Sequence, residues 1–350
     1  MSAITSDGNL VHYEVLGRGR PVILVHGWVG SWRYWIPTLQ LLQTKYRAYA
    51  LDLYGFGDSA KNPKHYTLEQ QILLLDEFMH QLGIPKAALI GHGLGALVVT
   101  EFARRYPDRV PRILLASAPL FDPGNLEQRT PAPPPTRARL AQTGRLDANA
   151  LNIASTLSST SSAASASASA AMRAAMLAAR QSRTPNPATT ETKETPALSV
   201  APVVPSAPPL NPLLGLMENT PEMLLARCFR RSEENFNKLS ADLVKIDPPV
   251  LGKSVENFDA GRMLDSLRLL TIPVLVVHGV DDPLIPQPNE AVLNYVTQDK
   301  ENLLLPILFP NVRHFPMLED DRFARLANEF LEVPDISRLE VKERWRRRTR

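Results

Sequence analysis

The chain has 350 residues, 44% of them hydrophobic, which is enough for one large core with an inserted segment. Its formal net charge of +3 excludes a chain dedicated to polyanions, so we expect no nucleic acid as a partner. A single cysteine excludes an internal disulfide, and the sequence shows neither a signal-peptide pattern nor a membrane-spanning apolar run. We therefore expect a cytoplasmic protein.

The first third of the chain alternates short apolar runs with amphipathic stretches. The apolar runs predict strands at 21–25, 49–53, 87–90 and 112–116, and the amphipathic stretches predict helices at 35–42, 68–82 and 94–106. Thr67 and Gln70 form a capping box for the second helix, which Gly83 is placed to end. Repeated strand–helix units imply a parallel sheet, so residues 1–121 are expected to form the first part of an α/β core.

A long segment without aromatic residues interrupts this pattern. Phe121 and Phe229 enclose a stretch with no Phe, Tyr or Trp, and thirteen of the 31 prolines lie between Pro123 and Pro212. Because such a segment buries little surface to offset its ordering entropy, we expect a mostly disordered, low-complexity insertion at 122–213, with one helix near 170–180. Its expected role is a flexible tether, and binding of a protein partner is the alternative.

The last part of the chain returns to the earlier pattern. Residues 221–239 predict a helix, within a helical cap remnant at 214–264. Strands at 272–278 and 302–308, with helices at 289–296 and 320–331, predict the second part of the core at 265–335. The basic tail at 336–350 is expected to be solvated, with contact to an anionic membrane surface as the alternative.

Two glycine-containing turns carry the first half of a candidate site. His26, Gly27 and Trp28 follow the strand at 21–25, where such a turn exposes backbone N–H groups that can hold a developing oxyanion. Residues 91–95 read Gly-His-Gly-Leu-Gly between a strand and a helix, the setting of a nucleophile elbow, G-x-S-x-G. The central residue of this elbow is Gly93, which has no side chain, and the amide of Leu94 is expected as a second oxyanion donor.

A carboxylate and a histidine complete the candidate site. Asp282 follows the strand at 272–278, at the carboxyl end where open parallel sheets carry their ligands. His314 follows the last strand and is expected to lean on Asp282, which would fix its tautomer and raise its basicity. Asp281 is expected to be a solvated neighbour of the acid.

Two further segments extend the pattern. Residues 51–59 are similar to a D-x-x-G-x-G-x-S loop, and residues 103–110 are similar to the end of a post-elbow helix. With the order elbow, acid, histidine, the chain resembles the α/β-hydrolase fold family of esterases, epoxide hydrolases, dehalogenases, haloperoxidases and C–C-bond hydrolases. The resemblance covers about 8–121 and 265–332.

This resemblance implies an α/β-hydrolase fold, with a mostly parallel central sheet, flanking helices, a diverged cap and the long insertion. It implies neither a cofactor nor a metal. It also assigns roles by position: Asp282 as the acid, His314 as the general base, Trp28 and Leu94 as oxyanion amides, Gly27 and His92 in the substrate pocket, and Gly93 at the nucleophile position.

Gly93 departs from the family pattern, because glycine can neither attack a carbonyl nor form a covalent intermediate. The side chains that could replace it lie away from the elbow: Ser31, Ser117, Asp122 and Cys228, the last expected to be core packing. Gly91, Gly93 and Ala96 also match the dinucleotide fingerprint, but several strands precede them and no acidic residue ends the next strand, so nucleotide binding is not expected.

Three hypotheses follow for function. The first is a degenerate hydrolase, a pseudoenzyme that binds a small, largely apolar ligand or a partner without turnover. The second is a non-covalent enzyme of hydrolase or lyase type, in which a His314–Asp282 dyad acts as general base. The third is an interaction protein that acts through its insertion and its basic tail.

Overall fold

The computed structural model describes residues 2–129, 211–300 and 302–339. The chain divides into two compact units, residues 1–132 with 208–350, and residues 133–207. The second unit lies wholly outside the described residues, as do the helix expected near 170–180 and most of the basic tail. All of the described residues belong to the first unit.

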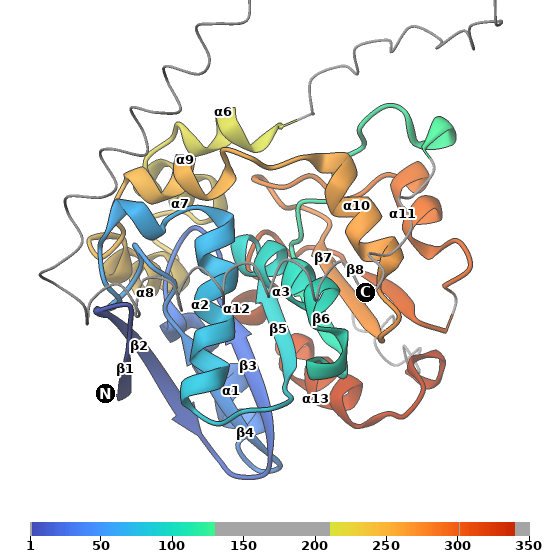
Figure 1. The fold of residues 1–350 in the computed structure, drawn as a ribbon. Helices are drawn as coiled ribbons and strands as arrows, with labels where there is room; N and C mark the ends of the chain where they lie inside the picture. The colour runs from blue at the N-terminus through green and yellow to red at the C-terminus, as the bar shows by residue number, and fades with distance from the viewer. Residues whose placement is uncertain (1, 130–210, 301, 340–350) are drawn as a thin grey trace, which may run out of the picture. The chain divides into compact units, whose positions relative to one another are not determined.

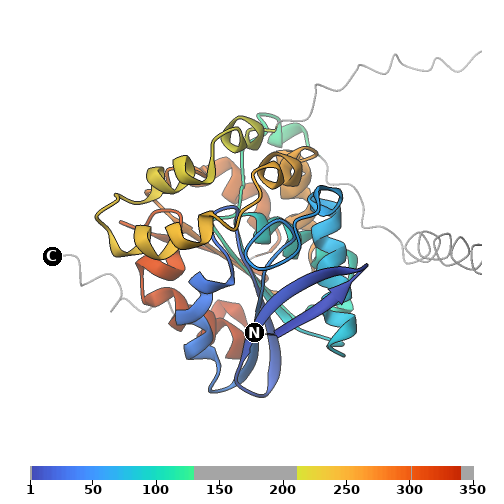
Figure 2. The ribbon, with the colours of Figure 1, turned by 90° about the vertical axis from the view of Figure 1, so that its left-hand side faces the viewer.

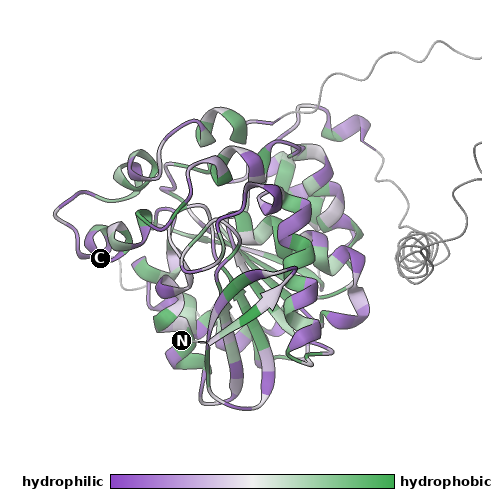
Figure 3. Cartoon of the chain, turned by 60° about the vertical axis from the view of Figure 1, so that its left-hand side comes forward, coloured by the Kyte–Doolittle hydropathy of each residue, from purple (hydrophilic) through white to green (hydrophobic). Residues whose placement is uncertain are grey.

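An eight-stranded, mostly parallel sheet forms the centre of this unit, as the sequence predicts (Figure 1). Its spatial order is β1-β2-β4-β3-β5-β6-β7-β8, and only the β1/β2 and β2/β4 pairs are antiparallel. The strands are β1 (Ser2–Ser6), β2 (Asn9–Leu16), β3 (Arg20–Val25), β4 (Tyr46–Leu51), β5 (Ala88–His92), β6 (Ile113–Ala116), β7 (Val274–Gly279) and β8 (Leu304–Phe309). The central strands are buried along their whole length and mostly apolar, because both of their faces are covered, and Figure 3 shows their hydrophobic colouring.

Helices cover both faces of the sheet. In Figure 2, α1 and α13 lie on one side, and α2 and α3 lie on the other. Trp35, just before α1, is fully buried and packs against Phe323 of α13. The core helices are α1 (Ile36–Leu42), α2 (Leu68–Gln81), α3 (Leu94–Arg105), α11 (Glu290–Thr297), α12 (Pro316–Glu319) and α13 (Arg322–Glu332). None of the helices in the described ranges is long and apolar enough to cross a membrane.

A second group of helices lies between β6 and β7 in the sequence and covers one end of the sheet (Figures 1 and 2). These are α6 (Leu213–Met217), α7 (Pro221–Cys228), α8 (Glu234–Leu243), α9 (Pro249–Val255) and α10 (Ala260–Leu269). We call α6 to α9 the cap. The single helix predicted at 221–239 is wrong, because the chain is extended at Phe229, whose ring packs against Phe315 of the core. Tertiary contact overrides helical periodicity here.

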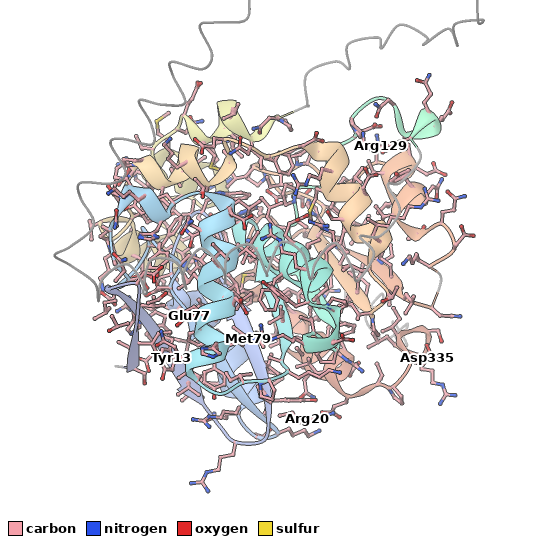
Figure 4. All side chains as sticks on the ribbon, in the orientation of Figure 1. Tyr13, Arg20, Glu77, Met79, Arg129 and Asp335 are labelled. Carbon is pink, nitrogen blue, oxygen red and sulfur yellow. The ribbon has the colours of Figure 1, made fainter. Side chains whose placement is uncertain are left out.

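Two details at the start of the chain differ from the sequence pattern. The β1–β2 hairpin was not predicted, although its turn, Asp7-Gly8, has positive φ at both residues and is a strong hairpin signal. Strand β4 begins at Tyr46 and ends at Leu51, so Asp52 stands in the following loop and not in the predicted strand at 49–53. Tyr13 of β2 packs edge-on against Phe78, which neighbours Met79 in α2 (Figure 4).

The first residues of the predicted insertion are held by the core. The side chain of Asn289 donates to Asp122 at 2.8 Å, and Arg129 donates to Asp265 of α10 at 2.9 Å (Figure 4). The predicted insertion starts at 122, and the predicted second part of the core starts at 265. These two starting points therefore lie in segments that contact one another.

The loop after β4 generates a first prediction about stability. Gly57 has a φ of 50°, and a Cβ there would overlap the carboxylate of Asp52, which accepts the N–H groups of Trp32 and Asp58. We expect Gly57→Ala to lower the free energy of unfolding by at least about 3 kcal/mol in urea titrations, because strain and overlap add.

Gly83 offers the matched control. Its φ is 62°, but a Cβ there would meet nothing within 4 Å. Gly83→Ala should therefore cost only the conformational strain, about 1 kcal/mol. Equal losses in the two variants would contradict a role for the Asp52 overlap.

Candidate active site

The structure joins His314 to Asp282, as the sequence predicts. The two residues follow β8 and β7, which are parallel neighbours, so their loops leave the sheet at the same end. The distance from His314 Nδ1 to Asp282 Oδ2 is 2.8 Å, and the side chains are only 1% and 0% exposed. The Nε2 atom of His314 has no hydrogen-bond partner among the described residues and is the ring nitrogen available to a ligand.

Asp282 is held as a carboxylate. Its Oδ1 accepts the backbone N–H groups of Leu284 at 2.8 Å and Ile285 at 3.0 Å. Burial opposes the charge, but the neighbouring His314 and these donors outweigh it and lower the pKa of Asp282 to about 2. The adjacent Asp281 is exposed, as expected.

The turn between β5 and α3 has the backbone of a nucleophile elbow. Gly93 has φ 51° and ψ −110°, a conformation that side-chain-bearing residues adopt only under strain. A Cβ at Gly95 would overlap the carbonyl of Val25, and the Gly95 N–H donates to the carbonyl of His26 at 3.0 Å. The turn is therefore in direct contact with the end of β3.

Two backbone N–H groups are free beside this turn. The amides of Trp28 and Leu94, the predicted oxyanion donors, reach no acceptor within the described part of the chain. Leu94 is the first residue of α3, so its N–H has no partner in the helix and lies at the positive end of the helix dipole. The Gly27 N–H is instead taken by the hydroxyl of Tyr34 at 2.5 Å.

The side chain of Trp28 lies over Gly93. A Cβ on Gly93 would stand 3.1 Å from Cζ3 and 3.2 Å from Cε3 of the indole. The indole Nε1 donates to Ser254 of the cap at 3.1 Å, and the ring is almost fully buried. The indole therefore occupies part of the space next to the elbow.

Both nitrogens of His92 are used inside the protein. Nδ1 lies 2.8 Å from the Tyr34 hydroxyl, and Nε2 lies 2.8 Å from the carbonyl oxygen of His314. The ring packs closely on Gly27, whose Cβ, if present, would lie 2.8 Å from Nδ1. The substrate-lining roles of Gly27 and His92 stay predictions, and these hydrogen bonds were beyond sequence reasoning.

Hydrogen bonds and ion pairs join the cap to the core on two sides of the candidate site. Asp242 of α8 accepts from Ser31 at 2.6 Å and from Arg33 at 2.9 Å, next to the oxyanion turn. On the other side Arg313, adjacent to His314, donates to Glu233 of the cap at 2.6 Å and to Glu319 at 2.9 Å. These pairs hold the cap against both loops that carry the candidate site.

The remaining candidate nucleophiles are placed elsewhere. Ser31 is bound to Asp242, and Ser117 donates to the carbonyl of His314 at 3.0 Å. Cys228 is fully buried, and burial raises the pKa of its thiol, which fits the predicted role in packing. None of these groups stands on the elbow.

One group of side chains has the spacing of a metal site. Ligand atoms of His12, Asp52 and Asp58 lie within 4.8 Å of one another. The Asp52 oxygens already accept from Trp32 N–H, Asp58 N–H and His12 Nδ1, and Asp58 pairs with Lys245 at 2.7 Å. The group therefore serves as a hydrogen-bonded anchor for the loop after β4.

The alpha/beta hydrolase fold family matches residues 20–321, which is more than half of the chain and includes both turns, Asp282 and His314. The chain belongs to this family. The family match and the sheet with its covering helices confirm the fold that the sequence predicts.

Several relatives match about a third of the chain. The chain is 35% identical to bifunctional epoxide hydrolase 2 of Rattus norvegicus over 121 residues, which are 33% of this chain and 22% of that protein. It is 33% identical to a soluble epoxide hydrolase of Corynebacterium over 31% of this chain and 38% of that protein. It is 30% identical to the (lyso)-N-acylphosphatidylethanolamine lipase of Bos taurus over 34% of each. Each match therefore spans well under half of the relative.

Solved structures share the fold across nearly the whole chain. The meta-cleavage product hydrolase CumD of Pseudomonas fluorescens has a TM-score of 0.57 at 19% identity, over 95% of this chain and 97% of that one. An esterase of Thermogutta terrifontis has a TM-score of 0.57 at 20% identity, over 95% and 98%. At these identities the likeness concerns the fold alone.

The pairing of Asp282 predicts an acid-dependent loss of stability. Its lowered pKa stabilises the folded state above the unfolded-state pKa near ~4, and this contribution disappears as pH falls through about 2. We expect the difference in unfolding free energy between the native protein and Asp282→Asn to shrink by about 2–3 kcal/mol between about pH 5 and pH 2.

The neighbouring acid supplies the control for this measurement. Asp281→Asn changes an exposed carboxylate one position away and should leave the pH dependence of unfolding unchanged. A difference between native protein and Asp282→Asn that stays constant with pH would contradict the pairing.

Proposed function

We propose that this protein is a hydrolase-fold binding protein that lacks the covalent step of its family. The observation that supports this proposal most strongly is Gly93. The elbow has the strained backbone of its family, but Gly93 has no side-chain oxygen, sulfur or carboxylate that could act as a nucleophile. The groups around it that recognise a substrate are nonetheless arranged for binding. The proposed ligand is a small, largely apolar molecule with an electronegative oxygen, such as an ester or an epoxide.

The chemistry of the free groups supports this ligand class. The N–H groups of Trp28 and Leu94 have no acceptor among the residues that the structure describes, and His314 Nε2 can donate or accept. Two of the neighbouring side chains are aromatic: Trp28 lies over Gly93, and Phe315 packs against the ring of His314. Names of the relatives, which include epoxide hydrolases and a lipase, agree with an oxygen-bearing apolar ligand.

The intact dyad favours a second candidate, a non-covalent enzyme. His314 and Asp282 keep a 2.8 Å hydrogen bond although the elbow carries glycine at position 93 in place of a serine that they could activate. In this candidate His314 Nε2 removes a proton from water or from an acidic substrate group, while Trp28 and Leu94 stabilise the anion that forms. Partner binding through the segment at 122–213 and the tail at 336–350 stays a prediction, because these segments lie mostly outside the described residues.

A serine placed at the elbow tests the proposed function. A fluorophosphonate probe forms an Oγ–P bond with an activated serine and releases fluoride, so it should not label the native protein. Gly93→Ser should gain labelling, and Gly93→Ser with His314→Ala should lose it, as measured by mass spectrometry. Because a Cβ at Gly93 stands 3.1 Å from the indole, Gly93→Ser with Trp28→Phe is the variant that keeps the test valid if the single change distorts the turn.

Labelling of the native protein at another residue would contradict the proposal. So would an unlabelled, folded Gly93→Ser/Trp28→Phe protein, because the oxyanion donors and base would then not serve a serine at this position.

The two candidates differ in turnover by the native protein. On short p-nitrophenyl esters the binding protein should show no burst and no multiple turnover. Slow multiple turnover that falls at least about tenfold in both His314→Ala and Asp282→Asn would instead support general-base catalysis and contradict the first proposal. Asp281→Asn serves as the control for the charge change.

A further inference from the structure

A buried chain of hydrogen bonds joins the oxyanion turn to the loop of His314. The Gly27 N–H donates to the Tyr34 hydroxyl at 2.5 Å, and that oxygen lies 2.8 Å from His92 Nδ1. His92 Nε2 in turn lies 2.8 Å from the carbonyl oxygen of His314. Tyr34 is 3% exposed and His92 is 0% exposed, so water does not compete for these bonds.

The two ends of this chain fix the direction of every bond in it. A backbone N–H can only donate, so the Tyr34 oxygen accepts from Gly27 and its own proton goes to His92 Nδ1. A carbonyl can only accept, so His92 Nε2 carries the ring proton and donates to His314. Burial, and then the nearby charge of His314, hold the pKa of His92 well below its usual value, so the ring stays neutral in this one tautomer.

The peptide group between His314 and Phe315 makes two further hydrogen bonds. Its carbonyl also accepts from Ser117 Oγ at 3.0 Å, and the following N–H, of Phe315, donates to Glu319 at 3.0 Å. At the other end of this series of hydrogen bonds, the Tyr34 hydroxyl accepts the Gly27 N–H, whereas the next amide, of Trp28, has no acceptor among the described residues. The two loops that flank Gly93 are thus tied through two side chains.

We propose that Tyr34 and His92 are positioning residues that set the distance between the oxyanion donors and His314. Their positioning role acts through the backbone and needs no contact with the ligand. The proposal deepens the proposed function, since it concerns the same donors and the same base. It also explains why His92, next to the elbow, has neither nitrogen free for a ligand.

Nitrogen NMR of the histidine rings tests this independently of any ligand or activity. In the native protein the His92 ring should show the Nε2–H tautomer with no titration between about pH 5 and pH 8. Tyr34→Phe removes the donor to Nδ1, so the His92 nitrogens should shift, and the ring nitrogens of His314 should shift with them. An Nδ1–H tautomer or a titrating His92 in the native protein would overturn the proposal.

Tyr54→Phe is the matched control for a general effect of losing a buried tyrosine hydroxyl. Tyr54 is buried like Tyr34, and its hydroxyl donates to Ser6 far from the elbow. His314 signals that move equally in Tyr54→Phe and Tyr34→Phe would reduce the role of Tyr34 to ordinary stability and overturn the proposal.

A second measurement uses the serine introduced at Gly93. In the Gly93→Ser protein, Tyr34→Phe and His92→Leu should slow fluorophosphonate labelling at least about tenfold. The reason is that His314 and the oxyanion donors would no longer be held at the same positions relative to the serine. His92→Gln, whose amide can still donate to the His314 carbonyl, should recover part of the rate. Equal rates in His92→Leu and His92→Gln would contradict the assigned bond.

The two proposals fail separately. If Gly93→Ser is never labelled, the proposed function fails while the NMR result on His92 and His314 still stands or falls by itself. If labelling is gained but Tyr34→Phe leaves both the rate and the His314 signals unchanged, only the positioning role fails.

Discussion

The packing of the β5–α3 turn against the end of β3 is the constraint on which the candidate site depends. Val25 and Gly91 pair across these parallel strands, and the Gly95 N–H reaches the carbonyl of His26. Such contact is closed to larger residues, because a Cβ at Gly91 or Gly95 would overlap neighbouring backbone. As a result, the turn that holds Gly27 and Trp28 lies against the elbow, where a Cβ on Gly93 would stand 3.5 Å from Gly27 Cα.

The buried His314–Asp282 pair is a second feature of the candidate site, and its burial costs free energy. Burying a carboxylate is unfavourable unless hydrogen bonds compensate, and Asp282 receives three, from two amides and from His314. The pair therefore has a structural role in joining the loops after β7 and β8, in addition to any chemistry. This structural role can keep both residues in place in a protein that has no serine to activate, which is why an intact dyad is compatible with binding alone.

The cap contacts the two loops that carry these groups. His314 and Trp28 are each about 1% exposed, and the cap is tied to their loops by charged pairs at Asp242 and Glu233. Since Arg313 and His314 are consecutive, the Arg313–Glu233 pair joins the cap directly to the loop of His314.

The sequence by itself determined the parallel core, the two turns, and the identities of Asp282, His314 and Gly93, because strand ends and glycine turns are local signals. It also placed the break in the core between β6 and β7. It missed the division of the helix at Phe229 and the Tyr34–His92 connection, because a ring that packs on Phe315 and a bond to a carbonyl 222 positions away leave no local pattern. Only the tertiary structure decided those, since they arise where distant segments meet in space.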